Sequence, residues 1–219
     1  MYRVVKRLFD IFGAILGLVV SFPVWLVAIV GIELSDPGPV FYMANRVGKG
    51  NKTFRMFKFR SMRQGNANES VFRGDEDRIF PFGQFIRDTK IDELPQLLNI
   101  LFGSMSFVGP RPAAVDQLNI VRVGKYSVAS TVTAGLTGPS ALYAYIYGDT
   151  VKSAEEYEKK VLPTRLNLDV YYVEHMGIGY DMKMIVYTIW CILFSVVGKC
   201  PKRIMREFLV CAESVEDKK

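Results

Sequence analysis

An uninterrupted apolar run near the start of the chain constrains the fold more than any other feature of the sequence. Residues 11–32 are apolar apart from Ser21, and the ten residues before them, MYRVVKRLFD, are basic and amphipathic. About 20 apolar residues suffice for a helix to cross the hydrocarbon core of a bilayer, so the run predicts a membrane segment. A cleaved signal peptide is the competing interpretation, but the run is long for one and lacks a small-x-small exit before Glu33.

The middle of the apolar run carries Ser21 and Pro23, which predict a break in the helix. Proline removes a backbone hydrogen bond and bends a helix at the preceding turn. Basic residues lie on both sides of the run: Arg3, Lys6 and Arg7 before it, and Arg46, Lys49, Lys52, Arg55, Lys58 and Arg60 after it. Because basic flanks favour the cytoplasmic side, we expect a re-entrant helix-break-helix that enters the cytoplasmic leaflet and returns; an ordinary kinked spanning helix is the alternative.

The composition fits one catalytic unit that lies at a membrane surface. Half of the 219 residues are hydrophobic, yet 23% are charged, and the net charge of +6 attracts anions such as phospholipid headgroups, nucleic acids or phosphorylated substrates. A single histidine, His175, disfavours multi-histidine metal sites and most histidine-base mechanisms. The three cysteines match no metal motif and fit a reduced, cytosol-facing protein: Cys191, Cys200 and Cys211.

The rest of the sequence predicts a small α+β domain that is mostly helical. Short strands are expected at residues 40–42 and 53–59 around a Gly48/Gly50 turn, a polar surface loop at residues 64–78, and helices at residues 79–89, 93–102, 154–175 and 181–197. The apolar segment 184–197 is too short to span a bilayer comfortably, so it is either a core helix or, as we favour, a helix embedded in the interface.

These elements divide the chain into three parts. We expect a re-entrant membrane helix at residues 1–36, a cytosolic catalytic domain with interfacial helices at residues 37–200, and a loose charged tail at residues 201–219. The chain would then be a monotopic membrane protein.

Two adjacent carboxylates, Asp92 and Glu93, are the main catalytic candidates. Pro95 is typical of a first helical turn, which predicts that Asp92 lies at or near the N-cap of the helix that follows. There, free backbone N–H groups and the positive helix end would keep the carboxylate ionised and favour a phosphate beside it. Asp92 is therefore either a nucleophile beside a phosphate site or a plain helix cap, and the spacing alone favours the cap.

Charge balance predicts a magnesium ion at the same place. Asp92 and Glu93 repel each other, so a cation is needed to keep both charged beside a pyrophosphate. Oxygen ligands and phosphate partners point to Mg²⁺, which would offset the pyrophosphate charge and polarise the attacked phosphorus.

Three basic side chains are candidates for holding phosphate. Arg111 stands between Pro110 and Pro112 in a rigid loop, and Lys58 and Arg60 alternate along one expected strand face. For each of them, simple exposure to solvent is the alternative. The segment 47–53 lacks the glycine and spacing of a nucleotide phosphate loop, and no Rossmann fingerprint is present, so neither an ATPase nor a dehydrogenase is supported.

Taken together, several segments resemble the bacterial sugar transferase family, the monotopic polyprenol-phosphate phosphoglycosyl transferases. The resemblance covers roughly residues 3–200 and rests on their order along the chain: KRLFD at 6–10, Ser21 with Pro23, KFRSM at 58–62, DELPQ at 92–96 and VGPRP at 108–112. It implies a re-entrant membrane helix and an active site on the cytoplasmic face of the bacterial inner membrane.

The resemblance also implies a reaction. Asp92 would attack the sugar-bearing phosphate of a UDP-sugar, UMP would leave, and polyprenol (undecaprenyl) phosphate would then take the sugar-phosphate from the enzyme, in a magnesium-dependent first membrane step of polysaccharide or glycoconjugate synthesis. Glu93 would support Asp92, bind the metal or manage the acceptor's proton. Arg111, with Lys58 and Arg60, would hold phosphates, and Asp169 belongs to a stretch that matches a late family segment near the site.

One segment departs from the family pattern. Many members carry an arginine in a Trp-Ala-Gln-Val-Asn-Gly-Arg segment, whereas residues 139–145 here read PSALYAY. Another cation would then have to do that arginine's work.

Two rivals to the covalent mechanism stay open. The first is a non-catalytic membrane module that binds nucleotide-sugar or anionic lipid, and the second is an enzyme using one direct displacement with Asp92 only as a metal ligand. Nucleic-acid binding is not expected, because no recognition helix stands out among the basic residues. A homo-oligomer is compatible with the sequence.

Overall fold

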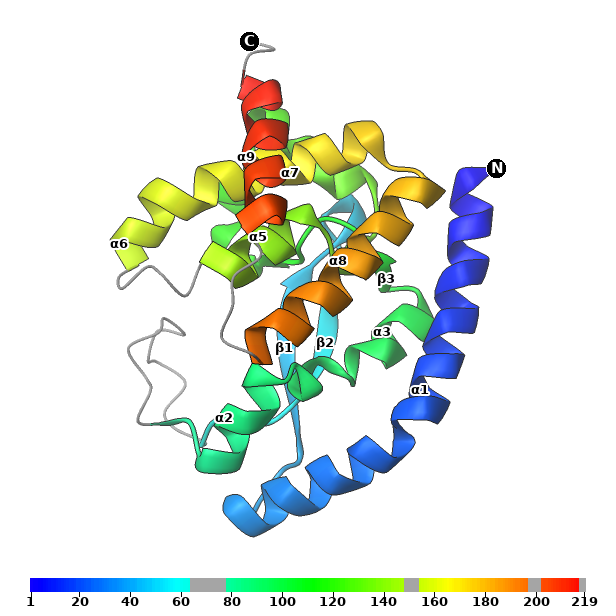
Figure 1. The fold of residues 1–219 in the computed structure, drawn as a ribbon, viewed down its shortest axis with the longest axis vertical. Coiled ribbons are helices and arrows are strands. Elements are labelled where there is room, and N and C mark those ends of the chain that lie inside the picture. The colour runs from blue at the N-terminus through cyan, green and yellow to red at the C-terminus, as the bar shows by residue number, and fades with distance from the viewer. Residues whose placement is uncertain (64–77, 148–153, 197–201, 217–219) are drawn as a thin grey trace.

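The computed structural model describes residues 1–63, 78–147, 154–196 and 202–216. Figure 1 shows a long N-terminal helix, α1, that follows one side of the molecule and bends beneath it, with short strands at the centre and helices around them. The described chain is mostly helical with two small sheets, which confirms an α+β fold. Most of the surface loop that we expect at residues 64–78 lies outside the described residues.

Helix α1 (Tyr2–Ser35) is continuous, with Pro23 inside it. Figure 1 shows it bent, and Trp25 Nε1 donates a hydrogen bond to Ser21 Oγ at 3.1 Å beside the proline. Its outward face is apolar and bare, since Phe12 and Leu16 are 72% and 65% exposed. Among the described helices, α1 alone is long and apolar enough to cross a membrane. The predicted break is therefore a bend within an unbroken helix.

The first turns of α1 are bound to the rest of the protein by polar contacts. Arg7 donates two hydrogen bonds to carbonyls at the end of helix α3 (Gln96–Phe102), to Ile100 O at 2.6 Å and Leu101 O at 2.8 Å. These carbonyls belong to the last turn of a helix, which lacks backbone partners of its own. Lys6 forms an ion pair of 2.7 Å with Asp181 of α8.

The other end of α1 is bound as well. Arg60, only 5% exposed, pairs with the Asp36 carboxylate directly after the helix and donates to Pro39 O at 2.6 Å. Both ends of the apolar helix are thus held by the same globular unit.

Glycines let α1 approach that unit closely. A Cβ on Gly13 would lie 2.7 Å from the Phe107 ring, and one on Gly31 would lie 2.3 Å from the Phe82 ring. Between these points Gly17 faces Leu97. The membrane helix therefore packs directly on α3 and on the strand that carries Phe107.

The larger sheet contains a hairpin and a short third strand. β1 (Phe41–Val47) pairs antiparallel with β2 (Thr53–Phe59), and β4 (Ala113–Ala114) adds to the other edge of β1. Gly50 has φ +65 in the connecting turn, a conformation that glycine adopts without strain. The two predicted strands and their turn are confirmed, and β1 extends five residues beyond the expected end.

A second, parallel pair joins β3 (Met105–Val108) to β5 (Ala134–Thr137). Between them run the short helix α4 (Leu118–Val121) and 3-10 turns at Val115–Gln117 and Gly124–Thr131. After β5 comes α5 (Pro139–Tyr147). The sequence analysis predicted none of these elements.

The predicted helices are present with changed bounds. Expected helices 79–89 and 93–102 are α2 (Pro81–Asp88) and α3 (Gln96–Phe102), the latter preceded by a 3-10 turn at Ile91–Glu93. The expected helix 154–175 is α6 (Ala154–Glu156), a π-helical segment at Tyr157–Val161 and α7 (Leu162–His175).

Helix α8 (Ile178–Val196) has two apolar faces with different surroundings. Met184 and Cys191 are buried in the main core, while Val186, Ile189 and Leu193 are 55–62% exposed. An exposed apolar helix face fits contact with lipid, as we expect for an interfacial helix.

The chain end is not a loose tail. Residues Lys202–Glu216 form α9, an amphipathic helix that crosses α7 in Figure 1. Four of its buried side chains complete the core to which Leu168 and Tyr172 of α7 belong: Ile204, Phe208, Cys211 and Ala212. The charge of this segment suggested a tail, but its apolar residues recur at helical spacing and give it a face to bury.

Removal of a core side chain from α9 should unfold the protein more easily. Phe208 is fully buried and Val210 is 60% exposed, so we expect Phe208→Ala to lower the free energy of unfolding by about 3–5 kcal/mol and Val210→Ala by roughly 0.5 kcal/mol or less. Denaturant titration in detergent, followed by circular dichroism, measures both. Equal, small losses would show that α9 does not contribute to the core.

Candidate active site

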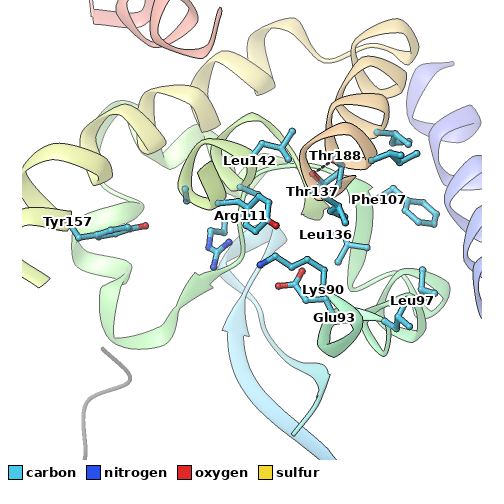
Figure 2. Close-up of a pocket in the computed structure, with 17 residues that line it drawn as sticks. Lys90, Glu93, Leu97, Phe107, Arg111, Leu136, Thr137, Leu142, Tyr157 and Thr188 are labelled. Atoms are coloured by element: carbon cyan, nitrogen blue, oxygen red, sulfur yellow. Dashed lines mark hydrogen bonds between the residues drawn. The ribbon is translucent and has the colours of Figure 1, made fainter. Parts of the chain in front are cut away.

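A cavity of about 560 Å³ lies between α3, β5, α5 and α8. One part of its wall is polar and carries Lys90, Glu93 and Arg111; another part is apolar, with Leu97 and Phe107. Figure 2 shows Arg111 near the centre, with Lys90 and Glu93 on one side of it and Tyr157 on the other. Its volume is in the range that accommodates a nucleotide-sized ligand.

The two candidate carboxylates lie in the 3-10 turn Ile91–Glu93. Lys90 precedes this turn with φ +59, in the left-handed region, and so turns the chain sharply into it. Glu93 lines the cavity, and Asp92 is buried beside it, 6% exposed.

The predicted N-cap role of Asp92 is wrong. Pro95 occupies the cap position of α3, whose first residue is Gln96, and no side chain caps that helix. Asp92 lies three residues before the cap, because the segment that follows it forms a 3-10 turn and not the first turn of α3.

Lys58 of β2 bridges the two carboxylates. Its Nζ lies 3.0 Å from Glu93 Oε1 and 3.5 Å from Asp92 Oδ2. Burial alone would lower the pKa of Lys58, but the charges of Glu93 and Asp92 outweigh burial and raise it. Lys58 is therefore a permanent cation at the carboxylate pair, and its expected role in holding phosphate stays a prediction.

The adjacent carboxyls titrate in opposite directions. Burial raises the pKa of Asp92 above its ordinary value of 3.8; Lys58 offsets part of the rise and Glu93 adds to it. Burial alone would also raise the pKa of Glu93, but nearby positive charges outweigh burial and lower it to about 2. Those charges belong mainly to Lys58, Lys90 and Arg111. Asp92 is thus the more basic carboxylate of the two.

Asp92 also has unused hydrogen-bonding capacity. Its Oδ1 is buried and accepts no hydrogen bond from the described residues. A buried, unsatisfied carboxylate oxygen is costly, which is typical of groups kept for chemistry or for a ligand. This oxygen is free to bond to phosphorus or to a cation.

Arg111 is positioned by Asp169, which is itself buried. The Arg111 backbone N–H donates to Asp169 Oδ1 at 3.2 Å, and Ser140 Oγ of α5 donates to the same oxygen at 2.5 Å. The Asp169 carboxylate therefore fixes the loop that carries Arg111, while the Arg111 side chain lines the cavity. Asp169 supports the site from behind and does not line the cavity.

Arg60 lies apart from this cluster. Its guanidinium binds Asp36 and Pro39 O and stacks over the Phe80 ring at 5.6 Å. The strand β2 ends at Phe59, so the alternation that would put Arg60 beside Lys58 ends one residue early. Arg60 therefore holds the C-terminal end of α1 and does not lie beside Asp92 and Glu93.

Lys90 and Tyr145 are among the cavity residues that the sequence analysis missed. Lys90 adds a second positive charge near the carboxylates, and its Nζ lies 4.4 Å from the centre of the Tyr145 ring. The position of Lys90 two residues before Asp92 was a usable signal. Tyr145 comes from the segment that departs from the family pattern, and no local feature of the sequence indicated its place.

The dyad has few ligands of its own to offer a metal ion. Across the described residues, no group of three or more His, Cys, Asp or Glu side chains could hold one. Magnesium, however, is often bound by one or two carboxylates together with substrate phosphates. Asp92 and Glu93, with the unsatisfied Asp92 Oδ1, fit that kind of shared site.

The comparisons with known proteins agree with one another. A family model described as bacterial sugar transferase matches residues 1–195. A UDP-N-acetylgalactosamine-undecaprenyl-phosphate N-acetylgalactosaminephosphotransferase from Aeromonas hydrophila is 35% identical over 198 residues, 88% of this chain and 44% of the relative. A UDP-glucose:undecaprenyl-phosphate glucose-1-phosphate transferase from Xanthomonas campestris pv. campestris is 36% identical over 193 residues, 85% and 38% of the two chains.

A shorter relative matches over nearly its full length. The exopolysaccharide production protein PSS of Rhizobium leguminosarum bv. phaseoli is 36% identical over 197 residues, which cover 86% of this chain and 95% of the relative. The chain spans less than half the length of the Aeromonas and Xanthomonas proteins.

Neutralising the two carboxyls should change stability with opposite signs. Because folding raises the pKa of Asp92, its charge destabilises the folded state, so Asp92→Asn should stabilise the protein at pH 7. Because folding lowers the pKa of Glu93 to about 2, Glu93→Gln should destabilise the protein, by about 1–3 kcal/mol.

The same carboxyls set the pH dependence of these effects. The loss of stability caused by Glu93→Gln should persist above about pH 4.5, the ordinary pKa of glutamate, and fade as the pH falls toward 2. The gain of stability caused by Asp92→Asn should fade as the pH falls through the raised pKa of Asp92 toward 3.8. Denaturant titrations between pH 7 and 3.5 measure both, and effects of the same sign would contradict the described electrostatics.

Proposed function

Because the chain belongs to the bacterial sugar transferase family, we propose that it transfers a sugar-1-phosphate from a UDP-sugar to undecaprenyl phosphate and releases UMP. The observation that carries this proposal is the partly buried Asp92–Lys58–Glu93 cluster beside a cavity whose wall also bears Arg111. Carboxylate, ammonium and guanidinium groups are the set that phosphoryl transfer to a carboxylate requires.

In the first half-reaction, Asp92 Oδ1 attacks the phosphorus that bears the sugar. A bond forms from this oxygen to phosphorus, the phosphoanhydride bond breaks, and UMP leaves with the bonding electron pair. The raised pKa of Asp92 favours it as nucleophile over Glu93, since the more basic carboxylate is the better electron donor. Because Asp92 lies just behind the cavity wall, its side chain must turn toward the cavity as phosphate competes for Lys58.

In the second half-reaction, an oxygen of the acceptor phosphate attacks the same phosphorus. The bond to Asp92 breaks, the carboxylate is regenerated, and the product is a polyprenyl diphosphate sugar. Glu93, whose pKa is about 2, stays ionised throughout. A role in holding cations suits Glu93 better than carrying a proton.

Three cations assist both steps. Lys90 and Arg111 line the cavity and would hold the phosphate oxygens, and Lys58 would keep Asp92 ionised until phosphate arrives. Mg²⁺, held by Asp92, Glu93 and substrate phosphates, would supply further neutralisation of pyrophosphate charge.

The apolar part of the cavity suits the acceptor's hydrocarbon chain. Leu97 and Phe107 line it on the side backed by α1, and Ile185 and Ile189 of α8 line it on the other. Ile189 is also 55% exposed on the apolar face of α8, so this wall continues onto a lipid-facing surface. A polyprenyl tail could therefore reach the site from the membrane.

The placement of α1 supports a monotopic protein at the bacterial inner membrane. A straight helix of 34 residues is about 51 Å long, more than the bilayer core. Arg7 and Asp36, at its two ends, nevertheless bind the same globular unit. We infer that α1 enters and leaves on the cytoplasmic side, with the catalytic domain and Lys58 on that side too.

Mass spectrometry tests the covalent step. We expect the purified protein in nanodiscs with magnesium and a panel of UDP-sugars, without acceptor, to gain the mass of one sugar-phosphate on the peptide that contains Asp92. Asp92→Asn should abolish this adduct and lower UMP release by roughly 10⁴-fold or more, as expected for loss of a nucleophile. Glu93→Gln should still form the adduct, because Asp92 is intact.

The rivals give different results in the same experiment. UMP release that depends on acceptor, with no adduct at any time, would support direct displacement. Binding of UDP-sugar without UMP release would support the non-catalytic module. An adduct lost in Glu93→Gln but kept in Asp92→Asn would move the nucleophile to Glu93.

Cysteine labelling tests the re-entrant geometry. In a background without Cys191, Cys200 and Cys211, single cysteines at Arg3 and Pro37 should react with a membrane-impermeant maleimide only when the cytoplasmic face is accessible. We therefore expect both to be labelled in inside-out vesicles and neither in spheroplasts. Labelling of the two positions from opposite faces would establish a spanning helix.

A further inference from the structure

Three aromatic rings line the cavity, and their surroundings differ. Phe107 lies at the apolar part, where it packs against Gly13 and meets Phe9 edge-on at 6.0 Å. Tyr145 is covered by Lys90 at 4.4 Å. Tyr157 is the third ring, and in Figure 2 it lies on the far side of Arg111 from Lys90 and Glu93.

Tyr157 is held in place by a buried cation. Arg165 of α7 is 8% exposed, donates from NH1 to the Tyr157 hydroxyl at 2.7 Å, and lies 5.9 Å from the centre of the ring. The hydrogen bond anchors the hydroxyl end of a ring that is itself half-buried. An anchored aromatic ring at a cavity wall is a platform on which another planar group can stack.

The backbone at Tyr157 is unusual. Tyr157 begins the π-helical segment Tyr157–Val161 between α6 and α7. Such segments add a residue to a helical turn, redirect the side chains there, and are frequent at functional sites. The π segment thus lies where Tyr157 reaches the cavity and where Val161 of the same turn is fully buried.

Several positively charged side chains lie near Arg111. Burial lowers the pKa of Arg46, and the charges of Arg111 and Arg165 lower it further. Arg122 NH2 donates a hydrogen bond to Arg111 O at 3.4 Å. In Figure 2 the Arg111 guanidinium lies between Tyr157 on one side and Lys90 and Glu93 on the other, so positive charge stands between the aromatic ring and the carboxylates. A nucleoside diphosphate sugar has a base, two phosphates and a sugar in the same order.

We propose that Tyr157 stacks on the pyrimidine base of the donor nucleotide, with Arg165 as the positioning residue that holds the ring. This inference rests on the proposed function and adds the donor's orientation to it. The base lies against Tyr157, the phosphate that leaves as part of UMP lies at Arg111, and the transferred phosphate lies beside Lys90 and Glu93. The apolar wall beyond them is left to the acceptor.

Two probes separate the base from the phosphate. UMP and ribose 5-phosphate share a phosphate and a ribose, and only UMP has a base. Their dissociation constants would be measured by calorimetry on the full chain in nanodiscs. Wild-type protein should bind UMP about 5- to 150-fold more tightly than ribose 5-phosphate, which corresponds to the stacking of one base on an aromatic ring.

Substitutions at Tyr157 and Arg165 test the stacking through their effect on the ratio of the UMP and ribose 5-phosphate affinities. Tyr157→Ala should reduce the ratio of the two affinities to near one and leave ribose 5-phosphate binding unchanged within about twofold. Tyr157→Phe keeps the ring and should retain most of the ratio. Arg165→Met keeps a long side chain but loses the hydrogen bond to Tyr157, and should give a smaller reduction of the ratio.

Each other outcome overturns the proposal in a distinguishable way. An unchanged ratio in Tyr157→Ala, in a protein that still releases UMP from UDP-sugars, would remove the stacking role and leave the proposed function standing. Equal weakening of both ligands would show that Tyr157 acts through the phosphate site. Wild-type protein that binds neither ligand and releases no UMP would overturn the proposed function together with the platform.

Discussion

The docking of one apolar helix by polar contacts at both of its ends organises the rest of the molecule. Arg7 binds the carbonyl end of α3, and Asp36 binds Arg60 after β2, so the two ends of α1 are tied to elements that also position the candidate carboxylates. The outer face of α1 is apolar and exposed, while its inner face packs on the globular unit. The apolar helix and the candidate site are thereby fixed relative to each other, and α1 backs Phe107 and Leu97 at the apolar part of the cavity.

The candidate site keeps a buried carboxylate, Asp92, without a full set of hydrogen-bond partners. Asp92 is buried with one oxygen unsatisfied, and burial raises its pKa, whereas one residue later Glu93 is held ionised by surrounding cations. The single positive charge of Lys58 can neutralise only part of the combined negative charge of Asp92 and Glu93. A fold selected for stability alone would replace such a buried carboxylate, so its presence fits a group kept reactive for a ligand that brings its own charge.

The sequence predicted the elements that local rules determine and missed those that depend on distant partners. The β1–β2 hairpin followed from alternation and a glycine turn, α1 followed from its uninterrupted apolar run, and α2 and α8 followed from helical patterns. The strands β3 and β5 are four residues each and pair across 25 intervening residues, so nothing local marks them. The prediction of a loose charged tail was wrong for the same reason. The charges of α9 are visible in its own sequence, but α7, against which α9 packs, is separated from it by another helix.

The candidate site divides in the same way. The Asp92–Glu93 pair, Lys58 and Arg111 were predicted as site residues from residue type and resemblance, and the structure brings the pair together with Lys58 and places Arg111 at the same cavity as Glu93. Arg60 was misjudged because its partner, Asp36, is distant in sequence, and Lys90 was missed because its importance depends on a turn that sequence patterns do not show.

The arginine missing from residues 139–145 is explained by what those residues do here. They form the start of α5, where Ser140 is fully buried and binds the carboxylate that holds Arg111, and where Tyr145 lies under the Lys90 ammonium. An arginine on this helix would add a cation to a wall that already bears Lys90 and Arg111, the two cationic residues that line the cavity in the described part of the chain. Under the proposed function, the positive charge for phosphate would come from the turn before Asp92 and from the Pro110–Pro112 loop, and α5 contacts these cations without adding one of its own.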